Sequence, residues 1–143
     1  MDFLKANYHA HTWRCQHAYD TEREYIEAAI SMGIEIFGFS DHVPCPYQDG
    51  YVSNIRMTMK QAPEYVETIR RLEAEYRDQI KIYVGFEAEY VPKFYEEQMR
   101  MFRNLGCDYM IMGQHFLGSE ENGPYTGTET CLLYTSPSPR DTR

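Results

Sequence analysis

The sequence lacks the features that would direct it to a membrane or to nucleic acid. No stretch approaches the ~20 apolar residues of a membrane-spanning helix, and residues 1–6 contain no apolar signal-peptide core. Basic runs are also missing, and 14 Lys and Arg against 22 Asp and Glu give a net charge of −8. Such an acidic chain is a poor partner for DNA, RNA or an anionic membrane. We expect a cytoplasmic protein, and the sequence leaves the oligomeric state open.

Cysteine and glycine patterns exclude further classes. The four cysteines form no CxxC pair, and we expect no disulfides in a reducing compartment. Cys15 lies between His11 and His17, so it is either a metal ligand or, as is commoner for a free cysteine, a small buried thiol. The glycines form neither a Rossmann nor a P-loop pattern, and no internal repeat is present.

What remains is typical of a soluble, folded domain. Hydrophobic residues make up 43% and charged residues 25%, and the 13 tyrosines argue against disorder. A small anionic substrate would need a local positive charge in so acidic a chain. A bound metal cluster could supply that charge.

The last residues differ from the rest. Residues 131–141 resemble one reading frame of a transposase adapter used in DNA sequencing libraries. We therefore expect the natural reading frame to end near Thr130 and residues 131–143 to be a non-native tail. The alternative is a genuine Ser/Pro-rich tail. On the first interpretation, only residues 1–130 inform function.

Residues 1–130 alternate strand-like and helix-like runs. Strands are predicted at residues 3–9, 34–40, 80–86 and 109–113, and helices at 21–32, 63–76 and 93–105. The first helix opens on a capping box, with Thr21 as the cap. In the third helix, the positions predicted to be buried are Phe94, Met101, Phe102 and Leu105. The order βαβαβαβ implies parallel strands with right-handed crossovers, as in a doubly wound sheet or about half of a (β/α) barrel.

Candidate ligands follow every predicted strand. They are His9, His11 and His17 after the first, Asp41 and His42 after the second, Glu87 and Glu89 after the third, and His115 after the fourth. The carboxyl ends of parallel strands meet at one edge, where α/β folds build their sites. The chain has only five histidines, and all of them fall at this edge.

The residue types indicate a metal site. Imidazole and carboxylate are ligands chosen by Zn, Mn and Fe. In an extended segment the side chains of His9 and His11 point the same way, so they can bind one ion together. Glu87 is placed to bridge two ions, and ions held ~3.5–4 Å apart can clamp a phosphoryl group.

Each motif alone has a simpler explanation. A single HxH is more often structural, Asp41–His42 could be a capping or surface pair, and His115 could be a satisfied core histidine. Glu89 could face the same side as Glu87, but a solvated carboxylate, or one that supports a ligand from behind, is favoured. Their joint placement at strand ends favours the metal site.

The motifs resemble those of the polymerase-and-histidinol-phosphatase (PHP) phosphoesterases. The resemblance rests on HAHT at 9–12, His17, GFSDH at 38–42, GFE at 85–87 and GQHF at 113–116. It covers residues 3–118. The longer forms HAHTWRCQHA at 9–18 and GFSDHVP at 38–44 resemble the histidinol-phosphatase branch.

The resemblance implies an α/β fold, a distorted (β/α)7 TIM-like barrel with three metal ions at the carboxyl ends of its strands. Residues 1–130 would be a partial PHP domain, the N-terminal half of that barrel. By resemblance, His9, His11 and Glu87 bind one ion, Glu87 bridges to a second ion shared with His115, and His17 and His42 bind a third. Asp41 would orient the His42 region from behind. A later histidine and a C-terminal Asp-x-His of the family are missing, since no histidine follows His115.

The implied reaction is hydrolysis of L-histidinol phosphate in histidine biosynthesis, with Zn, Mn or Fe binding the phosphate oxygens. Arg56 would either contact phosphate or be a surface arginine. Three alternatives stay open: a general PHP phosphoesterase, a non-catalytic metal-binding fragment for the truncated chain, and a PHP module that serves a DNA polymerase. The acidic charge argues against the last.

Overall fold

The computed structural model describes residues 5–126. The expected boundary near residue 130 and the expected tail at 131–143 lie outside these residues, as does the start of the first predicted strand. No helix in the described part of the chain has the length and apolar character needed to cross a membrane.

All predicted elements are present in the predicted order. They are β1 (Ala6–Asn7), a 3-10 helix η1 (Trp13–Cys15), α1 (Glu22–Ser31), β2 (Ile36–His42), α2 (Ala62–Tyr76), β3 (Lys81–Ala88), α3 (Tyr95–Leu105) and β4 (Tyr109–Met112). β1 is shorter than predicted, whereas β2 and β3 each continue two residues further. Those extra residues carry candidate ligands of the site.

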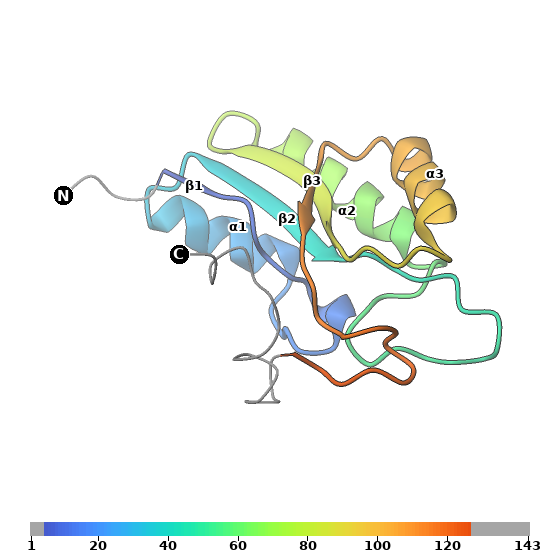
Figure 1. The fold of residues 1–143 in the computed structure, drawn as a ribbon. Helices are drawn as coiled ribbons and strands as arrows, with labels where there is room; N and C mark the ends of the chain where they lie inside the picture. The colour runs from blue at the N-terminus through green and yellow to red at the C-terminus, as the bar shows by residue number, and fades with distance from the viewer. Residues whose placement is uncertain (1–4, 127–143) are drawn as a thin grey trace, which may run out of the picture.

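The sheet decides between the two topologies that the sequence left open. Its four strands are all parallel and follow the order β1-β2-β3-β4 (Figure 1). A doubly wound sheet reverses its strand order partway, whereas here each strand adds to the same side of the previous one. The strands form a curled half-barrel with helices, as expected for the N-terminal half of a (β/α) barrel.

Local signals explain the helix ends. Thr21 accepts from the Glu24 N–H while the Glu24 side chain accepts from the Thr21 N–H, so the predicted capping box is confirmed. α3 ends at Gly106, whose φ of 65° is left-handed and suits glycine. These signals are local in sequence, which is why the order of elements could be predicted.

The core lies between the sheet and its helices. Phe37 and Phe39 of β2, Val84 and Phe86 of β3, and Ile69 of α2 are all buried there. The predicted burial along α3 is wrong in part. Met101, Phe102 and Leu105 are only partly buried, whereas Gln98 is buried because its amide donates to the Pro44 carbonyl at 3.1 Å.

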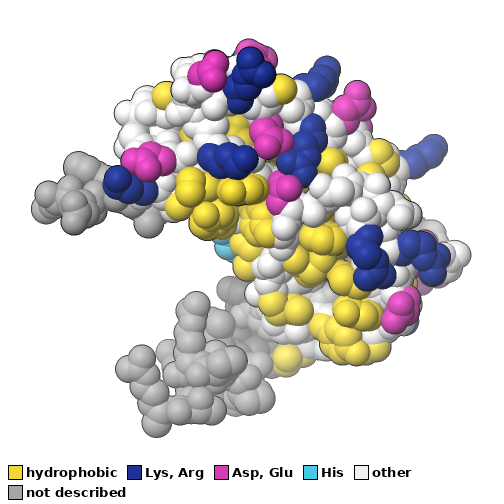
Figure 2. All heavy atoms as spheres, turned by 90° about the horizontal axis from the view of Figure 1, so that it is seen from above, with side chains coloured by type: hydrophobic (Ala, Val, Ile, Leu, Met, Phe, Trp, Pro, Cys, Tyr) yellow, Lys and Arg dark blue, Asp and Glu magenta, His cyan; other side chains and the backbone are white. Residues whose placement is uncertain are grey.

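The opposite, inner face of the sheet is open. A Cβ atom at Gly38 or Gly85 would collide with Tyr109, so these glycines let that tyrosine lie across the strands. Tyr8, whose ring lies near those of Tyr83 and Tyr109, is 44% exposed. In the space-filling view, hydrophobic side chains gather along the hollowed side, and charged side chains of both signs spread over the opposite rim (Figure 2).

Candidate metal centre

The five histidines come together at the carboxyl edge of the sheet. Ring centroids lie 5.1 Å apart for His9 and His11, 4.3 Å for His11 and His42, and 4.5 Å for His42 and His115. His17 completes the cluster, 5.5 Å from His11 and 5.3 Å from His42. Parallel pairing explains the gathering, since His42 lies opposite Glu87 and Glu87 opposite Ile111.

Glu87 is the centre of this cluster. Its Oε2 lies 3.1 Å from His9 Nε2, 3.3 Å from His11 Nε2 and 3.3 Å from His42 Nδ1. Its Oε1 lies 3.4 Å from His115 Nε2. The carboxylate is only 7% exposed, so one buried negative group faces four imidazoles.

The donor set fits divalent cations. His42 Nδ1 and Glu87 Oε2 are buried and make no hydrogen bond within the described part of the chain. Buried polar atoms normally have partners, so this pair points to a ligand between them. Gly113 leaves room for the carboxylate itself, because a Cβ atom would sit 2.5 Å from Glu87 Oε1.

Within residues 5–126, three groups of side chains could each hold an ion. They are His9, His11 and Glu87; His42, Glu87 and His115; and His11, Cys15 and His17. The first group is the one predicted. His42 groups with Glu87 and His115 rather than with His17, which instead groups with Cys15. Burial raises the pKa of the Cys15 thiol to about 11, which disfavours the thiolate that a metal needs.

Asp41 supports the cluster from behind. It is fully buried, and its Oδ1 lies 3.4 Å from His11 Nδ1. Oδ2 accepts from the Thr12 N–H at 3.3 Å and from the Thr12 hydroxyl. His42 contacts Asp41 only through its backbone N–H, at 3.1 Å. Asp41 therefore orients the ring of His11, and it contacts His42 through the backbone alone.

Arg56 is buried rather than exposed. Its guanidinium pairs with Glu89 and Glu120 and donates to the Val43 carbonyl at 3.2 Å. In the structure, Glu89 and Glu120 therefore occupy the guanidinium that was expected either to contact a phosphate or to lie on the surface. Glu120 had no sequence signal, because a single Glu in a loop is ordinary.

Arg14 is a second buried cation that the sequence reasoning missed. It pairs with Glu22 and Glu64 and donates to the Thr12 hydroxyl at 3.2 Å. Through Thr12 it holds Asp41 in place. An arginine inside a predicted loop carries no pattern that distinguishes it from a surface residue.

The titration of the metal-free cluster follows from these contacts. Burial alone would lower the pKa of His11, but the nearby carboxylates of Asp41 and Glu87 raise it to about 9. Contacts with Glu87 and Glu89 likewise raise the pKa of His115 to about 9. Burial and the neighbouring His11 and His115 lower the pKa of His42 to about 3. Burial opposes ionisation of Glu87, yet His11 and His115 bring its pKa below the usual range.

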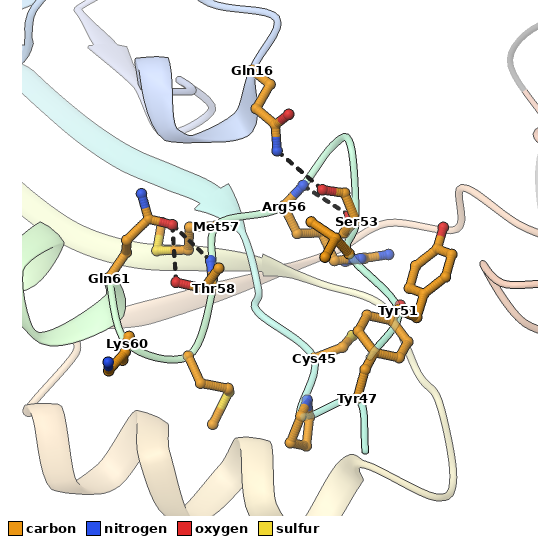
Figure 3. Close-up of a pocket in the computed structure, with 13 residues that line it drawn as sticks. Gln16, Cys45, Tyr47, Tyr51, Ser53, Arg56, Met57, Thr58, Lys60 and Gln61 are labelled. Atoms are coloured by element: carbon orange, nitrogen blue, oxygen red, sulfur yellow. Dashed lines mark hydrogen bonds between the residues drawn. The ribbon is translucent and has the colours of Figure 1, made fainter. Parts of the chain in front are cut away.

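Two cavities lie near the long loop between β2 and α2. One, of about 510 Å³, opens beside the cluster and is lined by His17, His42, Asn54, Ile55, Phe116 and Tyr125. The other, of about 310 Å³, includes Gln16, Cys45, Tyr47, Arg56 and Gln61 (Figure 3). Only the first contains candidate ligands, so it is the better candidate for a substrate site.

Comparison with known proteins gives consistent results. Residues 7–136 match the model of the PHP domain. The chain is 37% identical over 114 residues to a Deinococcus radiodurans protein named "Probable histidinol-phosphatase", covering 78% of this chain and 42% of that protein. It is 31% identical over 125 residues to the histidinol-phosphatase of Bacillus subtilis, covering 82% and 46%. The chain thus spans less than half the length of these relatives.

Two solved structures are also similar. The histidinol phosphate phosphatase of Lactococcus lactis, crystallised with Zn, L-histidinol and phosphate, aligns with a TM-score of 0.66 at 27% identity, covering 80% of this chain and 41% of that one. A Listeria monocytogenes structure aligns with a TM-score of 0.72 at 20% identity, covering 88% and 50%. At 20% identity, the second likeness bears on the fold alone.

Proposed function

The chain belongs to the PHP domain family, and from this premise we propose that the complete gene product is a histidinol-phosphatase. It would hydrolyse L-histidinol phosphate to L-histidinol and phosphate, in histidine biosynthesis and in the cytoplasm. The observation that carries the proposal is the cluster of imidazoles around Glu87. The names of relatives at 30–37% identity supply the substrate.

The proposed ligands follow the groups in the cluster. His9, His11 and Glu87 would hold one ion, Glu87 would bridge to a second held with His42 and His115, and His17 would contribute to a third. In the assignment implied by the family resemblance, His42 binds the third ion. Here we place it at the second ion instead, because it groups with Glu87 and His115. Zn, Mn and Fe all suit these ligands, and the Lactococcus lactis relative contains Zn.

The protein's own groups would bind and orient the substrate. Bound cations supply positive charge for the phosphate. The organic part would enter the cavity beside His17 and His42, where Ile55 and Phe116 offer apolar walls and Asn54 an amide. Asp41 and Glu89 would hold the imidazoles of His11 and His115 in place.

The experiment is to express the uninterrupted gene and to measure phosphate release from histidinol phosphate together with bound metal. We expect His9→Ala and Glu87→Ala to lose metal and activity together, while Arg23→Ala, a change in an exposed ion pair, keeps both. A metal-loaded protein that cleaves other phosphoesters but not histidinol phosphate would move the assignment to a general PHP phosphoesterase.

A second candidate applies to the 143-residue chain itself: a metal-binding fragment without catalysis. The observation that favours it is the coverage, since the chain spans 42–46% of the curated relatives cited above. Turnover by this chain at the rate of the full-length protein would contradict it.

A further inference from the structure

Glu89 is a buried carboxylate just beyond β3. Its Oε1 accepts the backbone N–H groups of His115 and Phe116, each at 2.9 Å, and the side-chain amide of Gln114 at 3.2 Å. The side chain is 3% exposed. One carboxylate oxygen therefore fixes the backbone of the segment that carries His115.

The ring of His115 lies between two carboxylates. Its Nε2 is 3.4 Å from Glu87 Oε1, and its Nδ1 is 3.4 Å from Glu89 Oε2. Nδ1 is buried and makes no hydrogen bond within the described residues, so Glu89 is the carboxylate that faces it. A neutral imidazole carries its proton on one nitrogen only. With that proton on Nδ1, the lone pair of Nε2 points towards Glu87.

Arg56 holds Glu89 in this position. Its guanidinium pairs with Glu89 Oε2 and also contacts Glu120 Oε2 at 2.6 Å and the Val43 carbonyl at 3.2 Å. The Arg56 side chain is 1% exposed. A buried carboxylate stays charged when a cation and hydrogen bonds replace water around it, and the planar fork of Arg suits contacts in several directions.

We propose that Glu89 is a positioning residue for His115 and that Arg56 fixes Glu89. Through Oε1, Glu89 fixes the backbone of His115. Through Oε2, Glu89 selects the tautomer of the His115 imidazole that presents an unprotonated Nε2 to Glu87. The proposal rests on the metal-binding part of the proposed function but not on its substrate. It also gives Arg56 a role other than contact with phosphate.

Glu89→Gln tests the ring contact in the full-length protein. Glutamine keeps an oxygen for the two N–H groups but loses the charge that faces Nδ1. Groups that support a metal-bound histidine typically change metal affinity by about 10- to 100-fold when they are altered. Titration of the metal-free protein with Zn²⁺ should show this loss of affinity at the ion held by His115. The loss should be smaller at the ion held by His9 and His11.

Glu120→Gln is the matched control. Glu120 is 4% exposed and pairs with the same arginine, but it contacts Tyr47 and Ser53 rather than a histidine. If Glu89 acts only by neutralising Arg56, the two variants will lose Zn²⁺ equally, and the proposal is overturned. A large loss in Glu89→Gln with little change in Glu120→Gln supports it.

A measurement on the unmodified protein covers the case in which a variant does not fold. Nitrogen-15 spectra of the Zn²⁺-loaded full-length protein should show His115 protonated at Nδ1, whereas a proton on Nε2 would overturn the proposal. Both readouts work in a protein that binds Zn²⁺ yet fails to cleave histidinol phosphate. Failure of the proposed substrate is therefore distinguishable from failure of the positioning role.

Discussion

At the scale of single residues, Gly113 shows how a position without a side chain shapes the centre. A Cβ atom there would lie 2.5 Å from Glu87 Oε1 and 2.8 Å from His115 Cε1. Both groups would have to shift, although neither ligand is itself changed. The requirement for glycine here comes from the close approach of two candidate ligands.

We therefore expect Gly113→Ala to weaken Zn²⁺ binding by about 10-fold or more, as displacement of supporting groups does elsewhere. Calorimetric titration of the full-length protein measures this. Gly33→Ala is the control, since it strains a left-handed backbone (φ 75°) but meets no atom within 4 Å. Equal metal affinity in Gly113→Ala and the wild type would contradict the prediction.

The raised pKa values of His11 and His115, both about 9, predict proton release on metal binding. Near neutral pH both rings are protonated in the metal-free protein, and a metal displaces those protons. We expect release of about two protons per cluster and an affinity that rises with pH up to about 9. Calorimetry in two buffers of different ionisation enthalpy measures the protons, and none released would refute this.

The same shifts set the stability of the metal-free fold. The pKa of His11 is raised from 6.5 to about 9. Its favourable contribution to the free energy of unfolding is therefore fully present below pH 6.5 and is lost as the pH rises through 9. The pKa of His42 is lowered to about 3, so its contribution is present above pH 6.5 and is lost as the pH falls towards 3. Metal-free stability should therefore peak between these limits.

At the scale of elements, the capping box at the start of α1 is the clearest local determinant. Thr21 and Glu24 satisfy each other's backbone N–H groups. We expect Thr21→Ala to lower the free energy of unfolding by about 1 kcal/mol, measured by urea denaturation of the full-length protein. Thr21→Ser keeps the hydroxyl and should stay close to wild type. A loss of the same size in Thr21→Ser would show that the hydroxyl is not responsible.

At the scale of the whole molecule, the half-barrel leaves β4 at the edge of the described sheet. An exposed edge strand offers unpaired backbone groups to another chain, and Met112 on β4 is 68% exposed. The 143-residue chain should therefore self-associate more than the full-length protein does in sedimentation velocity experiments.

A charge on that edge should reduce the association. We expect Met112→Lys to shift the 143-residue chain towards monomer, since lysine on an edge strand opposes pairing. Met32→Lys is the matched control, because Met32 is 70% exposed but lies at the C-cap of α1 rather than on a strand. The same shift in both variants would point to net charge rather than the open edge.

The sequence by itself determined the order of elements and which candidate ligands would come together. Capping at Thr21, the glycine stop at Gly106 and the strand-like runs of β2 and β3 are local signals, so they can be predicted without the fold. The ends of parallel strands share one edge, so the sequence also indicated that His9, His42, Glu87 and His115 would meet.

Only the tertiary structure decided how these groups pair. The strand order separated the half-barrel from a doubly wound sheet, because order depends on where each crossover returns. Asp41 faces the ring of His11 rather than that of His42, and Arg56 turns inward to Glu89 and Glu120. Such contacts join residues more than 25 positions apart. They depend on loop paths and side-chain rotamers, which leave no periodic trace in a sequence.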